Sequence, residues 1–371
     1  MFENVASIST LTWYKGDVEV IRPIPGWEDA LRGEMERDLS RDTPYEELAN
    51  KVLKPYVVGR GIDLLKDPSK PFVKITLIPD QTRPKERFAL LVSLAHCVGD
   101  GHTFYTLHNM LDSTRPVIAL VPNRKAHVLD DIAKVLGGPL YASSLSNPPV
   151  GFIFRFFKGM FVSSVFGPKT EVRLFWIDEN WIQQEKELAQ KDITEGYVST
   201  NDVVTARFFE CTQVDEGIMA INFRGKIDNC LDVDAGNYFN YLVCRPSDYS
   251  SAHIRRSVQK TQNNTPLKPQ SKPLTSWEHL TSRSFYGATS NWSTFCMPVS
   301  LPNCEEELHV PVLPTDSISC PASFVTGLFL FRPGASKRVA AMFAGHPRAL
   351  EAVKASGMMG EDVYSCDKHS L

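Results

Sequence analysis

FALLVSLAHCVGDG, the sequence of residues 88–101, joins an apolar run to a turn that contains two glycines. The run Phe88 to Ala95 is almost wholly apolar and predicts a short strand that is covered on both faces. Beyond the turn, apolar residues recur at helical spacing and predict a helix from about Thr103 to Leu111. A strand, a sharp turn and a helix in that order indicate a fold in which strands and helices mix.

The turn carries side chains that can do chemistry. His96 follows the buried strand, and a histidine at neutral pH can take a proton from a hydroxyl or an amine. Asp100 stands where the turn folds back, so its carboxylate can fix the turn by pairing with a cation from elsewhere in the fold. Gly99 and Gly101 allow a close approach between the backbone and a ligand. The alternative is a purely structural turn in which His96 is a satisfied core histidine.

Strand and helix patterns continue along the chain without an internal repeat. Prolines and paired glycines and serines recur over residues 112–149, so we expect a connecting region there. The predicted class is α/β or α+β with two domains, residues 1–150 and residues 151–371. Further strands are expected at 71–79, 171–177, 218–223, 238–243 and 324–331, and further helices at 151–167, 179–190, from about 201, and at 335–343.

Segment 151–167 contains six phenylalanines and only a narrow polar strip of Arg155, Lys158 and Ser163. As a helix it would be apolar around most of its circumference. We expect a buried helix or one that walls an apolar tunnel. The alternative is a peripheral helix at a membrane surface, with its basic side chains reaching toward the lipid headgroups.

Composition excludes several classes of protein. Forty basic and 43 acidic side chains give a net charge of -3, which lacks the basic excess of a nucleic-acid-binding protein. The first residues do not resemble a signal peptide, and no run of 18 apolar residues predicts a transmembrane segment, so we expect a cytoplasmic protein. Eight cysteines lie without metal-ligand spacing, and we expect neither a metal site nor a disulfide scaffold. A monomer without a tightly bound cofactor is the simplest expectation.

The turn also resembles a family signature. H-x-x-x-D-G, here His96 to Gly101, is the signature of the acyl-CoA-dependent acyltransferases of the chloramphenicol acetyltransferase superfamily, and the BAHD acyltransferases are the most similar group within it. Three further segments resemble family motifs in the same order: STND at 199–202, NFR at 222–224 with GN at 236–237, and TSNW at 289–292. The resemblance runs from about Pro71 to Leu350.

This resemblance implies two similar α/β domains, each a mixed sheet flanked by helices, with an active-site channel between them. His96 would be the general base and Asp100 would pair with Arg224, while Gly101 would support the turn. The co-substrate would be an acyl-CoA and the acceptor a small hydroxylated or aminated metabolite. The candidate substrate-binding and CoA-binding residues are Asn201, Asn237, Ser290 and Trp292, and residues 245–283, with a net charge of +5, are a candidate surface for the CoA nucleotide.

Two departures from the family pattern keep other functions open. The stretch before His96 is short, so the first domain is expected to be reduced, and the family motif D-F-G-W-G is replaced by LPNCE at 301–305. A lipid-directed acyltransferase similar to wax ester synthases is one alternative, supported by segment 151–167. A catalytically inactive relative that serves as a binding protein is the other.

Overall fold

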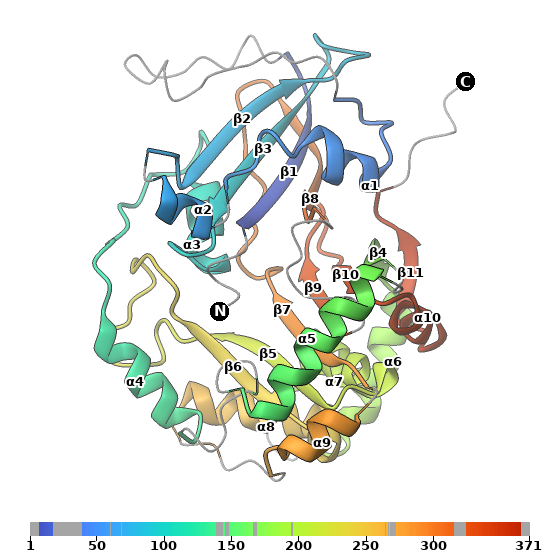
Figure 1. Ribbon diagram of the computed structural model, residues 1–371. Helices are drawn as coiled ribbons and strands as arrows, with labels where there is room; N and C mark the ends of the chain where they lie inside the picture. The colour runs from blue at the N-terminus through green and yellow to red at the C-terminus, as the bar shows by residue number, and fades with distance from the viewer. Residues whose placement is uncertain are drawn as a thin grey trace.

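The computed structural model contains two β-sheets with helices packed around them (Figure 1). It describes residues 7–17, 39–59, 61–67, 69–138, 144, 148–165, 169–193, 196–263, 265, 267, 272–282, 284–314 and 324–364. This arrangement confirms the predicted α/β architecture with two lobes.

The smaller sheet holds the strand that leads to His96. Within the described residues its strand order is β2-β3-β1-β8, and every pairing is antiparallel rather than mixed. The bounds are β1 Ser7–Lys15, β2 Val73–Pro79, β3 Arg87–Ala95 and β8 Glu305–Pro311. The edge strand β8 comes from the second half of the sequence, so this sheet is not built from residues 1–150 alone. The domain boundary near residue 150 stays a prediction.

The larger sheet is mixed, with the order β11-β4-β10-β9-β7-β5-β6 among the described strands. β7 pairs in parallel with both β5 and β9, whereas the other pairings are antiparallel. The bounds are β4 Glu171–Ile177, β5 Glu216–Asn222, β6 Phe239–Cys244, β7 Tyr286–Asn291, β9 Val325–Phe331, β10 Ala340–Gly345 and β11 Met359–Asp362.

Helices cover both sheets (Figure 1). α1 to α3 accompany the smaller sheet, and α5 crosses the front of the larger lobe in this view. The bounds are α1 Tyr45–Glu47, followed by the π-helix Leu48–Val52, then α2 Gly61–Lys66, α3 Gly101–Asn109, α4 Ala126–Val135, α5 Val150–Val165, α6 Glu179–Gln190, α7 Thr200–Thr212, the 3-10 helix Pro246–Asp248, α8 Ser251–Gln262, α9 Ser276–Thr281 and α10 Pro347–Ala355.

β3 is covered on both faces, as predicted. Phe88 and Leu90 pack with Phe104 of α3 on one face. Ala89 and Leu91 pack on the other face, in a core that also contains side chains of β4, β9 and β10 from the larger sheet. Because the two sheets share this core, β3 is packed against the larger lobe.

Two sequence predictions are wrong. Residues 340–345 form the strand β10 between β4 and β9, not part of a helix at 335–343. The connecting region 112–149 contains the ten-residue helix α4, whose Val128, Ile132 and Val135 are buried. For residues 340–345 and for α4, packing against the larger sheet determines the secondary structure more than the local sequence does.

α5 confirms the helix predicted at 151–167 over its described part, but not its burial. Phe154 is 65% exposed, Phe157 62% and Phe161 65%. The expectation of a buried helix is therefore wrong for this face. No helix in the described ranges has the length and apolar character needed to cross a bilayer.

Candidate active site

The turn 96–101 connects the C-terminal end of β3 to the N-terminus of α3. Asp100 is the N-cap of this helix: its backbone is extended, and its Oδ1 accepts a hydrogen bond of 3.0 Å from the backbone N–H of Thr103. A capping carboxylate satisfies a helix N–H that has no partner within the helix. The position of the turn is thus tied to the start of α3.

The other carboxylate oxygen of Asp100 bonds across the fold. Oδ2 lies 2.8 Å from Nη1 of Arg224 and accepts the backbone N–H of Tyr238 at 3.0 Å. Both charged side chains are buried, with 5% of the Asp100 side chain and none of the Arg224 side chain exposed. The ion pair that the resemblance implies is therefore present in the structure.

Every N–H of the Arg224 guanidinium has an acceptor. Nε donates to the carbonyl of Asp234 at 2.9 Å, Nη1 donates to Asp100 and to Oδ1 of Asn222, and Nη2 donates to Oγ1 of Thr103 and to the carbonyl of Gly236. Arginine has five such donors in a fixed plane, and all five are used here. Arg224 thus joins the loop 222–238 of the larger lobe to the turn and to α3.

His96 is half-buried at the end of β3. Its backbone carbonyl accepts a hydrogen bond of 2.9 Å from Nδ2 of Asn237, and its ring lies 5.9 Å from the ring of Phe239. Nδ1 of His96 and Oδ1 of Asn237 are buried without a hydrogen-bond partner among the described residues. Asn237, a candidate binding residue from the sequence, therefore contacts the backbone of the histidine.

The glycines of the turn are required by close packing. A Cβ on Gly101 would lie 3.0 Å from Nε1 of Trp292, so the indole packs on this residue. A Cβ on Gly99 would lie 2.7 Å from Cγ2 of Thr103, closer than carbon atoms tolerate. Their function is close approach within the fold, because neither has a positive φ.

Replacement of Gly99 by alanine should therefore destabilise the turn. We expect Gly99→Ala to lower the free energy of unfolding by about 1–3 kcal/mol, the usual cost of inserting a methyl group into a packed site. Gly59→Ala is the control, because a Cβ there would lie 3.8 Å from its nearest neighbour. Urea denaturation of both variants measures the difference, and equal stabilities would contradict the packing argument.

Trp292 connects the larger sheet to the turn 96–101. It follows β7, donates its backbone N–H to Leu330 at 2.8 Å, and its ring lies 6.2 Å from Tyr105 of α3 and 5.5 Å from Phe329. Ser290 is a half-buried residue of β7, paired in register with Phe329. The segment 290–292 thus lies at the junction of the two lobes.

Asn201 is placed differently. It lies in the first turn of α7, which Ser199 caps, and its Nδ2 lies 3.9 Å from the sulfur of Met219. Its described contact is thus with β5, not with the turn 96–101. A role in binding substrate stays a prediction for this residue.

Part of the basic stretch 245–283 has a structural role. Arg245 pairs with Glu216 at 2.9 Å, and Arg255 pairs with Asp202 at 2.5 Å; all four side chains are buried. The expectation of a positive surface over the whole stretch is therefore wrong for these two arginines. The exposed cations of the described part are Arg256, Lys260 and Lys272.

Cys97 adjoins the histidine, but its environment does not activate it. Burial raises the pKa of its thiol above the ordinary value, so the neutral form dominates at neutral pH. We expect Cys97→Ala to keep most of the activity, and mass spectrometry of the protein after incubation with acyl-CoA to reveal no covalent acyl-enzyme. An adduct on Cys97 would contradict this.

Thr103, Asp234 and Tyr238 bond to Asp100 or Arg224 but were not predicted as site residues. The capping pattern, an aspartate three residues before Thr103, was a usable signal. Asp234 and Tyr238 contribute backbone groups, which no side-chain pattern marks.

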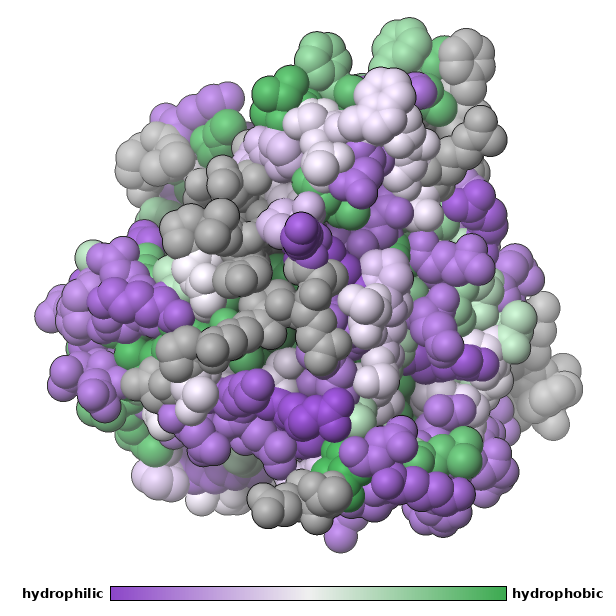
Figure 2. Space-filling model, turned by 90° about the horizontal axis from the view of Figure 1, so that it is seen from below, coloured by the Kyte–Doolittle hydropathy of each residue, from purple (hydrophilic) through white to green (hydrophobic). Residues whose placement is uncertain are grey.

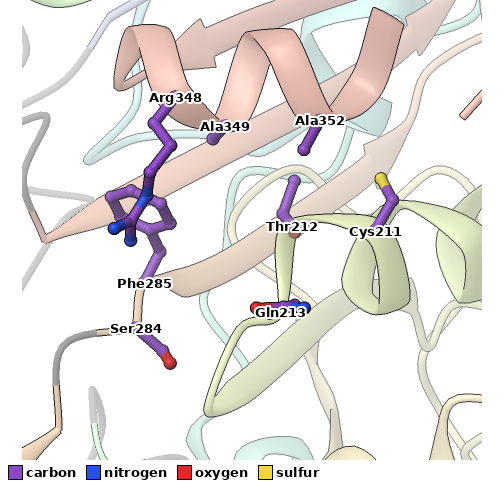
Figure 3. Close-up of a pocket in the computed structure, with 8 residues that line it drawn as sticks. All are labelled: Cys211, Thr212, Gln213, Ser284, Phe285, Arg348, Ala349 and Ala352. Carbon is purple, nitrogen blue, oxygen red and sulfur yellow. The ribbon is translucent and has the colours of Figure 1, made fainter. Parts of the chain in front are cut away.

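The pocket drawn in Figure 3 is not lined by any of the predicted site residues. It has a volume of 430 Å³ and lies between the C-terminal end of α7, the residues before β7, and α10. Its lining residues are Cys211, Thr212, Gln213, Ser284, Phe285, Arg348, Ala349 and Ala352. In the described part of the chain no three acidic, histidine or cysteine side chains gather as metal ligands would. A channel that reaches His96 stays a prediction.

Comparison with known proteins identifies solved structures of similar architecture. No model of a protein family matches the sequence, and no curated protein matches it. Among solved structures, vinorine synthase is similar with a TM-score of 0.53 and 10% identity, over 98% of this chain and 93% of that one. The chain has the fold of the BAHD acyltransferases. SgcC5 from Streptomyces globisporus is similar with a TM-score of 0.51 and 10% identity, over 96% of this chain and 91% of that one.

These likenesses confirm the two-lobed α/β architecture that the sequence motifs implied. At this level of identity the likeness concerns the fold, and one fold hosts many activities. Function must therefore be argued from the turn 96–101 and its surroundings.

Proposed function

We propose that the chain is an acyltransferase that moves an acyl group from a coenzyme A thioester to a hydroxyl or amine of a small metabolite. The observation that carries the proposal is the buried ion pair between Asp100 and Arg224, which fixes a histidine-bearing turn where the two lobes meet. The H-x-x-x-D-G signature supports the same assignment. In a preorganised site of this kind, correct geometry can supply a large part of the rate.

In the proposed reaction His96 acts as general base and then as general acid. Its Nε2 takes the proton from the acceptor as the oxygen or nitrogen of the acceptor forms a bond to the thioester carbonyl carbon. The tetrahedral oxyanion collapses, the carbon–sulfur bond breaks, and the coenzyme A sulfur takes the proton from Nε2. Acyl-CoA and acceptor become ester or amide and free thiol, with no acyl-enzyme. Asp100 does not touch the substrate but positions the turn.

The test is thiol release. We expect the purified chain to release free thiol from one of a series of acyl-CoAs, from acetyl to long-chain, only when a suitable hydroxylated or aminated acceptor is present. A chain that binds acyl-CoA in calorimetry but releases no thiol with any acceptor would be the inactive relative considered above. The acceptor series should include small aromatic alcohols, amines and a long-chain alcohol.

The exposed apolar side chains of α5 favour a second candidate, a lipid-directed acyltransferase. An acceptor held in a membrane would reach such an enzyme more easily if the protein sat at the membrane surface. Comparing transfer to a long-chain alcohol in vesicles with transfer to a short soluble alcohol separates the two candidates. The small-metabolite proposal fails if only the vesicle-bound acceptor reacts.

The monomeric state and the cytoplasmic location also belong to this proposal. The D-F-G-W-G motif is absent from the sequence, and the smaller sheet holds four described strands. Sedimentation velocity of the purified chain and fractionation of cells that express it test these two points.

A further inference from the structure

α5 packs one face against the larger lobe. Its only arginine faces the protein: Arg155 is 9% exposed, and its Nη1 lies 2.8 Å from Asp215. Phe152, one turn before it, is buried against Tyr286 and Phe324. These residues hold the helix against the larger lobe, so its orientation is fixed by an ion pair and by aromatic packing.

The opposite face of α5 is apolar and exposed. The exposed side chains are Val150, Ile153, Phe154, Phe157, Met160, Phe161, Val162 and Val165, with fractional exposures from 37% to 65%. Figure 2 shows apolar side chains that protrude at the upper edge of the view, the edge that corresponds to the front of Figure 1, where α5 lies. A large exposed apolar patch of this kind marks a surface that binds a membrane, a ligand or another protein.

The short helix α9 contacts the N-terminal end of α5 and carries exposed apolar side chains of its own. A Cβ on Gly151 would lie 1.9 Å from the carbonyl oxygen of Ser276, so the backbones of α5 and α9 touch at this glycine. Trp277 of α9 is 72% exposed and Leu280 is 46% exposed. Tryptophan and phenylalanine are the residues that settle at the boundary between lipid headgroups and acyl chains.

The charge around the patch is positive. Residues 140–170 contain three basic and no acidic side chains. Arg155 is neutralised by Asp215, which leaves Lys158 and Lys169, both exposed; Lys272 before α9 is exposed as well. Glu278 is the exposed acidic side chain of α9, and its carboxylate is engaged with Thr275. Exposed aromatic side chains together with exposed lysines match an anionic membrane surface.

We propose that α5, together with Trp277 and Leu280 of α9, docks the protein onto the surface of an anionic lipid bilayer. The helix lies parallel to the membrane, its phenylalanines enter the region between headgroups and acyl chains, and Lys158 contacts anionic headgroups. The inference does not rest on the proposed catalysis, because its readout is the fraction of protein bound to vesicles.

Co-sedimentation with vesicles tests the docking. We expect the full chain to bind vesicles that contain about 30% phosphatidylserine and to bind pure phosphatidylcholine vesicles more weakly. The triple variant Phe154→Ser, Phe157→Ser, Phe161→Ser should lose at least about tenfold in partitioning, because each phenylalanine contributes buried apolar area. The matched control is Val117→Ser, Ile118→Ser, two residues 70% and 58% exposed in the segment between α3 and α4, which should bind like the wild type.

A charge variant keeps the proposal testable even if the triple variant folds poorly. Lys158→Glu removes a positive charge and adds a negative one, so it should reduce binding to the phosphatidylserine vesicles by at least about tenfold and leave binding to phosphatidylcholine almost unchanged. Lys191→Glu, at an exposed lysine that follows α6, is its control. Absence of wild-type binding to both vesicles overturns the proposal. So does a lipid-free dimer in sedimentation velocity that the triple serine variant abolishes, because α5 would then bind a second copy of the chain.

Discussion

His96→Ala should slow transfer strongly and leave the fold intact. A positioned general base or acid contributes about 10²–10⁴ to the rate, so we expect kcat to fall by that factor. The free energy of unfolding should change by less than about 1 kcal/mol, because the imidazole is half-buried and Nδ1 has no described partner that its removal would leave unpaired. Thiol release and urea denaturation on the same preparation measure both quantities.

The matched control for this variant is another histidine. His127 is exposed on α4, and none of the predicted site residues lies in that helix. His127→Ala should keep the activity and the stability of the wild type. If His96→Ala released thiol as fast as the wild type in a correctly folded state, the proposed base would be wrong, whatever the fold.

The local parts of this site could be predicted from sequence because their causes are local. The apolar run before His96 gives β3, and the residues after Asp100 give α3, within a few residues of the observed bounds. The ion pair is different, because Asp100 and Arg224 are 124 residues apart. No periodicity brings such residues together, and only the family resemblance suggested the pairing.

The missed strands show where sequence patterns mislead. β1 contains Ser9, Thr10 and Thr12, all buried, so it does not look like the central strand of a sheet. Two of these side chains have partners that lie far away in sequence: Ser9 bonds to Ser93 at 2.8 Å and Thr12 to His309 at 2.8 Å. A buried hydroxyl is tolerated when it is hydrogen-bonded, but that partner is invisible in a local window.

β10 and α5 show a second limit of sequence-based prediction. The residue pattern of a segment does not reveal which other elements pack against it. The sequence AAMFAG at 340–345 suits a helix as well as a strand, and its position between β4 and β9 decides for the strand. For α5, composition predicted burial of the apolar side chains. The ion pair of Arg155 with Asp215 and the packing of Phe152 fix the helix so that its other apolar side chains are exposed instead.

Arg224→Met should destabilise the protein and inactivate it together. The variant leaves the Asp100 carboxylate buried without its cation and removes the donors of five hydrogen bonds. Breaking a buried ion pair from one side costs about 3–5 kcal/mol. Asp100→Asn should act in the same direction, since it removes the charge from the other side and weakens the cap of α3.

The control must separate a loss of stability from a misplacement of the turn that carries His96. Arg245 pairs with Glu216 at 2.9 Å and is equally buried, but Glu216 begins β5, whereas Asn222, the partner of Arg224, ends it. Seven residues of strand place the two pairs roughly 20 Å apart. Arg245→Met should therefore lower the free energy of unfolding by a similar amount while activity per folded molecule stays close to that of the wild type.

The decisive quantity is activity per folded molecule at a temperature where each variant is native. Misplacement of a catalytic group by about 1 Å can cost a factor of about 100, so we expect Arg224→Met to fall by that factor in kcat at nearly unchanged KM for acyl-CoA. Arg224→Lys, which keeps the charge but loses the planar set of donors, should lie between Arg224→Met and the wild type. If Arg224→Met and Arg245→Met were equally active, the ion pair with Asp100 would serve stability alone, and the position of His96 would not depend on it.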